Sequence, residues 1–133
     1  MNQNNLNHIK FLELLRIGDQ DELNSFINSC TEAGFSPHYI YMEIIFPSLV
    51  EIGELWSQGE MSIAEEHLCT QIIKSTMFFI DQKVKYKNTN GLKAVLACVK
   101  GETHYIGAKM FADFLTWDGW KCDFLGQDSP PET

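Results

Sequence analysis

The sequence predicts an α + α/β fold, in which a four-helix bundle precedes a parallel strand–helix–strand unit. Two observations lead to this class. Up to about residue 87, apolar residues recur at the spacing of amphipathic helices. Beyond a polar, turn-prone linker at residues 87–91, a continuous apolar run is followed by a helical pattern and a second short run. We therefore expect two domains, at residues 1–87 and 91–133.

The first two predicted helices are bounded by residues that favour helix ends. The apolar pattern over residues 5–17 ends at Gly18. Asp19 to Asp21 offer N-caps for a second helix, which Gly34 terminates. Four such helices joined by short connections are typical of a bundle.

The third predicted helix begins with Ser36 as N-cap and Pro37 in its first turn, and it runs to about Trp56. Pro47 lies inside it and is expected to kink or break it, because proline lacks a backbone donor and clashes with the preceding turn. The fourth helix begins at a capping box, Ser-Ile-Ala-Glu at residues 62–65.

Helical spacing also predicts which side chains are buried in the bundle and which are solvated. His8 and His38 lie at polar helix starts and are expected to be solvated. The aromatic residues that fit core positions are Tyr41, Phe46, Phe78 and Phe79.

The second domain opens with a short apolar run at residues 94–99, which suits a parallel strand buried on both faces. A helical stretch ending at Gly119 follows, and residues 122–126 are typical of a second strand. A crossover between parallel strands is expected to be right-handed.

Composition excludes several classes of protein. The 133 residues include 44% hydrophobic residues, which argues against wholesale disorder. Ten Lys and Arg against 18 Asp and Glu give a net charge of −8, which argues against direct nucleic-acid binding. No apolar run approaches the roughly 18 residues that a membrane span needs. The four cysteines are widely separated, which favours a reduced, cytoplasmic protein.

The first candidate site lies just after the first predicted strand, at the sheet edge where open parallel sheets bind ligands. Here Glu102 precedes His104 by two residues, and Gly107 follows it by three. A carboxylate can accept one imidazole N–H and leave the other nitrogen to bind a metal. Gly107 would let a flat ligand approach the backbone. The alternative is a surface histidine with an incidental acidic neighbour.

The second candidate site joins Trp56 at the end of the third helix to Glu66 and His67 near the start of the fourth. An indole beside two polar side chains can line a ligand pocket. Alternatively, Trp56 fills the core and Glu66 interacts with the helix dipole. The sequence contains no nucleophile elbow, phosphate-binding glycine loop or zinc-type cluster.

Together these features resemble cobalamin-binding modules, which carry a four-helix cap before a Rossmann-like (flavodoxin-like) domain. Residues 102–107, Glu-Thr-His-Tyr-Ile-Gly, resemble the family's Asp-x-His-x-x-Gly loop, with Glu in the place of Asp. The resemblance implies that His104 is the lower axial ligand of cobalt, that Glu102 orients it, and that Gly107 is the spacer glycine.

The cap resembles more narrowly the light-sensing adenosylcobalamin receptors of the CarH/LitR type, through their Trp-x9-Glu-His signature. This resemblance implies that Trp56 packs against the adenosyl group, and that Glu66 and His67 contact the same group. Ser57 stands where these photoreceptors commonly carry a second cobalt-binding histidine. These residues show no winged-helix pattern before the cap, so direct repression of a promoter by this chain is not expected. The Rossmann-like pattern stops at Thr133 after two strands, which leaves the sheet unpaired and its apolar face uncovered, so we expect a fragment or a chain completed by another polypeptide.

These resemblances imply a cytoplasmic, non-enzymatic sensory module that uses adenosylcobalamin as a light-responsive switch. Its readout would be homo-oligomerisation or the binding of a separate effector protein, without direct contact to nucleic acid or membrane. One alternative is a corrinoid shuttle protein of a methyltransferase system, which would hold methylcobalamin. Another is an interaction module that uses this fold without a cofactor.

Overall fold

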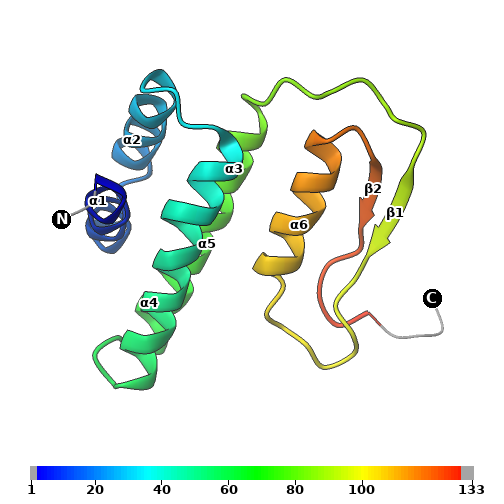
Figure 1. The fold of residues 1–133 in the computed structure, drawn as a ribbon. Helices are drawn as coiled ribbons and strands as arrows, with labels where there is room; N and C mark the ends of the chain where they lie inside the picture. Colours follow the sequence, from blue (N-terminus) through cyan, green and yellow to red (C-terminus); the bar gives the residue numbers. More distant parts are fainter. Residues whose placement is uncertain (1–2, 130–133) are drawn as a thin grey trace. The chain divides into compact units, whose positions relative to one another are not determined.

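The computed structural model describes residues 3–129, with side chains from residue 7 onward. The chain divides into two units, Met1–Lys83 and Val84–Thr133. Figure 1 shows the helices of the first unit and the strand–helix–strand arrangement of the second. The helical unit contains α1 (Gln3–Ile17), α2 (Gln20–Glu32), α3 (Pro37–Ile40), the π-helical turn η1 (Tyr41–Ile45), α4 (Phe46–Ser57) and α5 (Ile63–Asp81). The second unit contains β1 (Lys93–Leu96), α6 (Ile106–Trp117) and β2 (Lys121–Phe124).

The helix starts follow the local signals in the sequence. Asp19 caps α2 by accepting backbone N–H bonds from Asp21 and Glu22, each 3.0 Å long. At α5, the Ser62 hydroxyl accepts the Glu65 N–H, and the Glu65 carboxylate accepts the Ser62 N–H at 2.8 Å. The predicted capping box is therefore confirmed, and it satisfies two backbone donors that would otherwise lack partners.

The third predicted helix is a continuous helical run from α3 through η1 to α4. Its irregularity is one wide turn, in which the Phe46 N–H donates to the Tyr41 carbonyl, directly before Pro47. Pro47 cannot donate to the preceding turn. A π-turn accommodates this missing bond without ending the helix. The expected disturbance at Pro47 is thus a widened turn rather than a break.

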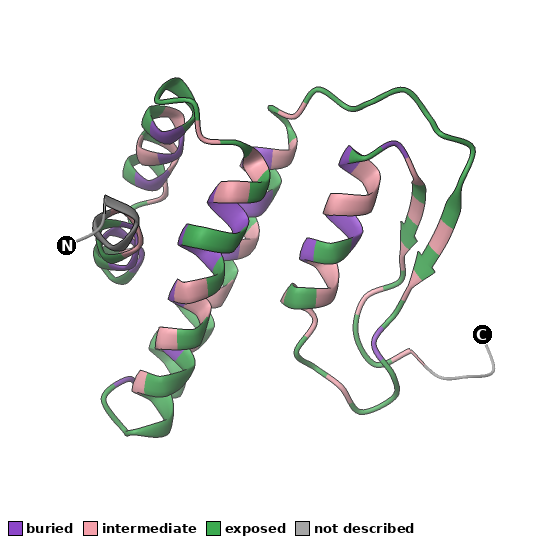
Figure 2. Cartoon of the chain, in the orientation of Figure 1, coloured by how far each residue is buried: buried purple, intermediate pink, exposed green. Residues whose placement is uncertain are grey.

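The core of the helical unit lies between α1, α2, η1 and α5, which pack against one another. Figure 2 shows buried residues repeating along one side of these helices. The Tyr41 side chain is fully buried, and its hydroxyl donates to the Met77 carbonyl at 3.3 Å. No helix among the described residues is long and apolar enough to cross a membrane. The largest fully buried apolar side chains are Phe11, Leu15, Leu23, Ile27, Ile40, Tyr41, Ile44, Ile45, Ile52 and Ile73.

Three predictions about individual side chains in this unit are wrong. Phe46 and Phe78 are 47% and 67% exposed rather than buried. His8 is not simply solvated, because its Nε2 lies 2.8 Å from a carboxylate oxygen of Glu51 and ties α1 to α4. Phe79 is partly buried, and His38 is exposed.

The second unit contains the predicted strand–helix–strand order. β1 and β2 pair in parallel, with Lys93 opposite Lys121 and Leu96 opposite Phe124, and α6 packs against β2. The expectation of burial on both faces is wrong for the described chain. Along each strand exposed and partly buried residues alternate, and Val95 is 67% exposed. Within residues 84–129 the one helix packs on one face, so the opposite face has no second layer.

The segment that leads into β1 is fastened to the turn between α6 and β2. The Asn90 N–H donates to the Gly119 carbonyl at 3.0 Å, and the Asn90 side-chain amide donates to the Asp118 carbonyl at 3.3 Å. Lys87 forms an ion pair with Asp118. Gly119 has a φ of 92°, and a Cβ placed there would lie 2.6 Å from the Asn88 carbonyl oxygen. Glycine is therefore required at this position for both its backbone conformation and its size.

Candidate functional site: an oriented histidine and an exposed tryptophan

The loop between β1 and α6 holds His104 through Glu102. One oxygen of the Glu102 carboxylate accepts the His104 backbone N–H at 2.6 Å and lies 2.9 Å from ring Nδ1. These contacts lower the pKa of the Glu102 carboxyl, chiefly through the backbone N–H and next through the imidazole. A carboxylate can only accept, so in the neutral imidazole this contact selects the tautomer in which Nδ1 donates and Nε2 has a free lone pair.

The His104 side chain is 96% exposed, so the oriented ring faces solvent rather than a protein partner. In the described part of the chain, no three His, Cys, Asp or Glu side chains converge into a metal-binding group. His104 therefore offers a single imidazole ligand. A single imidazole suits a metal that arrives with its other ligands already attached, as cobalt does in a corrin ring. The donor chemistry of this loop fits that cofactor.

Gly107 lies in the first turn of α6 and is exposed. Its φ is not positive, and a Cβ added there would meet no atom within 4 Å. Neither backbone conformation nor internal packing therefore explains a glycine at this position. A surface at which a flat ligand lies close to the backbone would explain it, as the sequence suggested.

In the helical unit, Trp56 occupies the last turn of α4 and is 50% exposed. This exposure argues against the alternative in which the Trp56 side chain fills the bundle core. Phe46 and Val50 are also exposed on α4, and Gly53 has open space where a Cβ would stand. At helical spacing, one side of α4 carries all four of these residues, Phe46, Val50, Gly53 and Trp56. α4 therefore presents an apolar strip that its own unit does not cover.

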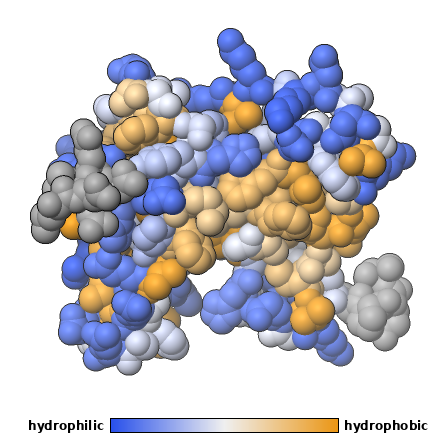
Figure 3. Space-filling model, viewed as in Figure 1, coloured by the Kyte–Doolittle hydropathy of each residue, from blue (hydrophilic) through white to orange (hydrophobic). Residues whose placement is uncertain are grey.

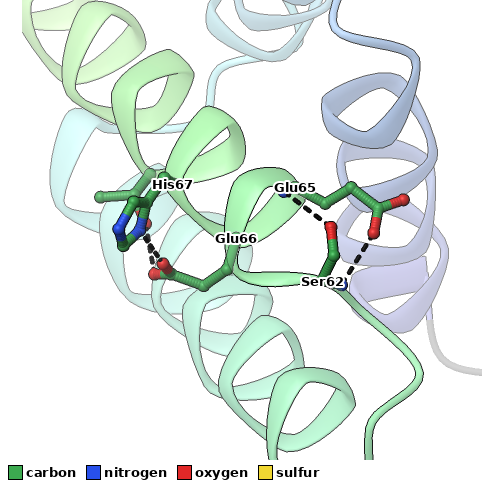
Figure 4. A network of polar contacts seen from close by, with 5 residues as sticks. Ser62, Glu65, Glu66 and His67 are labelled. Atoms are coloured by element: carbon green, nitrogen blue, oxygen red, sulfur yellow. Dashed lines mark hydrogen bonds and ion pairs between the residues drawn. The ribbon is translucent and has the colours of Figure 1, made fainter.

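Glu66 and His67 lie in the first turns of α5, which packs against α4. A Glu66 carboxylate oxygen lies 2.5 Å from His67 Nδ1, and the other accepts the Thr70 hydroxyl at 2.9 Å. Figure 4 shows this group pointing to the other side of the helix from the capping pair of Ser62 and Glu65. Glu66 thus orients His67 much as Glu102 orients His104. Glu66 also lies in the acidic first turn of α5, so its contacts with side chains are compatible with the expected interaction with the helix dipole.

The structure adds Asp128 to the site in the second unit. Its carboxylate accepts the Gly101 N–H at 2.7 Å, directly before Glu102. No motif in the sequence marks this residue, because the contact joins loops 27 residues apart. A clue available from the sequence is position, since Asp128 follows the second strand as His104 follows the first.

Apolar side chains also remain at the surface of the second unit. Figure 3 shows apolar surface over α6 in this view, and Phe111 of that helix is 55% exposed. Val95, Val99 and Leu125 are exposed along and after the strands. The two groups of candidate residues thus belong to separate units, each with uncovered apolar surface around it.

Comparison with known proteins gives one family match. A family model described as B12 binding domain matches residues 10–80, more than half of the chain and most of the helical unit. The HTH-type transcriptional repressor CarH of Myxococcus xanthus is 30% identical over 101 residues. That alignment covers 75% of this chain and 33% of the repressor, so the chain spans about a third of the curated relative.

Two solved structures share the fold. The Methanosarcina barkeri monomethylamine corrinoid protein has a TM-score of 0.77 at 16% identity, covering 95% of this chain and 59% of that one. A chain of the Methanosarcina barkeri methanol:cobalamin methyltransferase complex MtaBC has a TM-score of 0.55 at 16% identity, covering 92% of this chain and 47% of that one. At these identities the likeness concerns the fold.

Proposed function

Because the chain belongs to the B12 binding domain family, we propose that it is a sensory cobalamin-binding module in which His104 is the lower axial ligand of cobalt. The observation that carries this assignment is the exposed imidazole of His104, which Glu102 holds through both its backbone N–H and its Nδ1. A preoriented ring binds a metal without first losing rotational freedom.

The residues of the helical unit support adenosylcobalamin as the form bound. Bound adenosylcobalamin supplies a cobalt–carbon bond that light can break. Trp56 offers an exposed indole face, beside which Gly53 leaves open space. Glu66 and His67 offer hydrogen-bonding groups already held in place by each other. An apolar plane on α4 and polar groups on α5, which packs against α4, match the adenine and ribose of an adenosyl group.

In this proposal the chain binds and reports rather than catalyses. Loss of the adenosyl group would leave the apolar strip of α4 without its ligand, which favours a different arrangement of the helical unit. The readout would be a change in homo-oligomerisation or in binding of a separate effector protein. The excess of 18 acidic over ten basic residues supports the part of the proposal in which this chain does not bind nucleic acid directly.

A second function, corrinoid shuttle in a methyltransferase system, is favoured by the fold shared with the monomethylamine corrinoid protein. A shuttle needs an accessible upper face for its methyl group. The exposed tryptophan and the Glu66–His67 pair favour a covered upper ligand instead. The third candidate, an interaction module without cofactor, predicts that neither cobalamin is retained.

The test is to add adenosylcobalamin or methylcobalamin in the dark, remove the excess, and record visible spectra before and after green light. The sensor should retain adenosylcobalamin with a histidine-ligated spectrum that changes on illumination, together with a change in size-exclusion mass. Retention of methylcobalamin with poor adenosylcobalamin binding would favour the shuttle, and retention of neither would reject both functions.

Two matched pairs of variants assign the residues. His104→Ala should remove the histidine-ligated spectrum, whereas His38→Ala, which changes another exposed histidine, should preserve it. Trp56→Ala should reduce the preference for adenosylcobalamin over methylcobalamin, whereas Phe78→Ala, at an exposed aromatic on α5, should not. An unchanged spectrum in His104→Ala would refute the ligand assignment.

A further inference from the structure

Asp128 has the one positive φ among non-glycine residues in the described chain, at 52°. Asp is one of the few side chains that tolerate this left-handed conformation, because its carboxylate can hydrogen-bond to nearby backbone. Such conformations persist where surrounding contacts hold them, and they concentrate at functional sites. The contacts that hold Asp128 lead directly to the His104 loop.

Asp128 makes two hydrogen bonds to adjacent residues of that loop. Its carboxylate accepts the Gly101 N–H at 2.7 Å, and its own N–H donates to the Glu102 carbonyl at 3.2 Å. The left-handed backbone lets one residue direct both groups toward the same stretch of chain. Glu102 in turn binds the backbone and ring of His104. Asp128 therefore holds the main chain of the residue whose carboxylate holds the imidazole.

We propose that Asp128 is a positioning residue for His104, which fixes the Gly101–Glu102 backbone so that the Glu102 carboxylate holds the imidazole in one orientation. The part of this inference that concerns cobalt rests on the proposed function. The part that concerns the loop stands on the contacts of the cofactor-free chain.

Removing the Asp128 carboxylate should leave the two strands in place. The Cys98 N–H donates to the Gly126 carbonyl at 2.9 Å, and the Ser129 N–H donates to the Cys98 carbonyl at 3.0 Å. These backbone bonds join the ends of β1 and β2 without using the Asp128 side chain. A variant of Asp128 should therefore loosen the Gly101–His104 loop and not the sheet.

Three variants separate the carboxylate from the backbone conformation. Asp128→Gly keeps the positive φ and removes the acceptor, whereas Asp128→Asn keeps an acceptor oxygen and tolerates the same backbone. Gln127→Gly is the matched control, because it gives an exposed neighbour in the same loop the same added freedom. All three are made in the full chain.

The first readout is amide hydrogen exchange of the cofactor-free protein. We expect exchange at Gly101 to rise by about tenfold in Asp128→Gly, as expected for a lost hydrogen bond. It should stay near the wild-type rate in Asp128→Asn and Gln127→Gly. Unchanged exchange at Gly101 in Asp128→Gly would overturn the proposal.

The second readout is the visible spectrum with adenosylcobalamin bound in the dark. Asp128→Gly should shift the bound cofactor toward the form without histidine ligation, and Asp128→Asn should restore ligation. If His104→Ala changes the spectrum but Asp128→Gly does not, Asp128 does not position the ligand. If His104→Ala has no effect, the proposed function fails, while raised exchange at Gly101 in Asp128→Gly still supports the role of Asp128 in holding the loop.

Discussion

Substituting Gly119 with alanine tests the contact, within the second unit, between the linker at residues 87–91 and the turn between α6 and β2. The added Cβ would lie 2.6 Å from the Asn88 carbonyl oxygen, well inside van der Waals contact. Both atoms belong to main chain or lie next to it, so no side-chain rotation relieves the overlap. The segment around Asn88 must therefore move away from the turn between α6 and β2.

The expected loss of stability has two parts. Alanine at a φ of 92° costs about 1–2 kcal/mol in backbone conformation. Displacing the linker also breaks two hydrogen bonds from Asn90, to Gly119 and to Asp118, worth together about 1–3 kcal/mol. Gly126→Ala is the control, because its φ is 86° and its Cβ would meet no atom within 4 Å. Gly126→Ala should therefore lose only the stability that the backbone conformation of alanine costs.

Urea unfolding should be followed by tryptophan fluorescence in a Trp56→Phe background, so that the signal comes from Trp117 and Trp120 of the second unit. Limited trypsin digestion gives an independent measure, because Lys87 is paired with Asp118. Cleavage after Lys87 should accelerate in Gly119→Ala and not in Gly126→Ala. Equal stability losses, with unchanged cleavage at Lys87, would refute the reasoning.

Three further predictions concern the helical unit and the thiols. Ile27→Ala should lower the free energy of unfolding by about 2–5 kcal/mol, because the side chain is fully buried, while exposed Ile17→Ala should change it by less than about 0.5 kcal/mol. Similar losses in urea unfolding would contradict this. The pKa of the Glu65 carboxyl is lowered by hydrogen bonds from the side chain and then the backbone of the N-cap. Its contribution to stability is therefore complete above the ordinary pKa of 4.5 and is lost as the pH falls through the lowered folded value. The stability difference between wild type and Glu65→Gln should shrink between pH 6 and pH 3, and a constant difference would be evidence against the capping interaction. Burial raises the pKa of both the Cys69 and Cys122 thiols, but Cys69 is buried and Cys122 is only partly buried. At pH 8 Ellman's reagent should therefore modify Cys69 much more slowly than Cys122 until the chain unfolds. Equal rates in the native chain would contradict the burial of Cys69.

Features determined by neighbouring residues could be predicted from the sequence. The capping box at Ser62 and Glu65 and the approximate bounds of the helices depend on side chains within one turn of each other. Periodicity predicts core positions for Phe46 and Phe78 because it identifies an apolar face. Periodicity does not say whether another element covers that face, and both side chains are exposed.

The contacts of the candidate site also fall into local ones, which the sequence predicts, and long-range ones, which it does not. The contact between Glu102 and His104 spans two residues, so the sequence was sufficient to predict it. Asp128 and the His8–Glu51 pair join segments far apart in the chain, and no local pattern reports such contacts. Their discovery needed the folded arrangement of the loops and helices.

The wide turn at Tyr41–Ile45 sets the rotational phase of everything that follows it in the same helical run. Each residue of an α-helix advances by about 100° around the axis, and a π-turn inserts an additional residue into one revolution. A single-residue deletion that returned this turn to regular geometry would rotate α4 by about one residue step. Ile52 would leave the core, and Trp56 would face another direction. Pro47 therefore influences, through the turn before it, which side of α4 is left exposed.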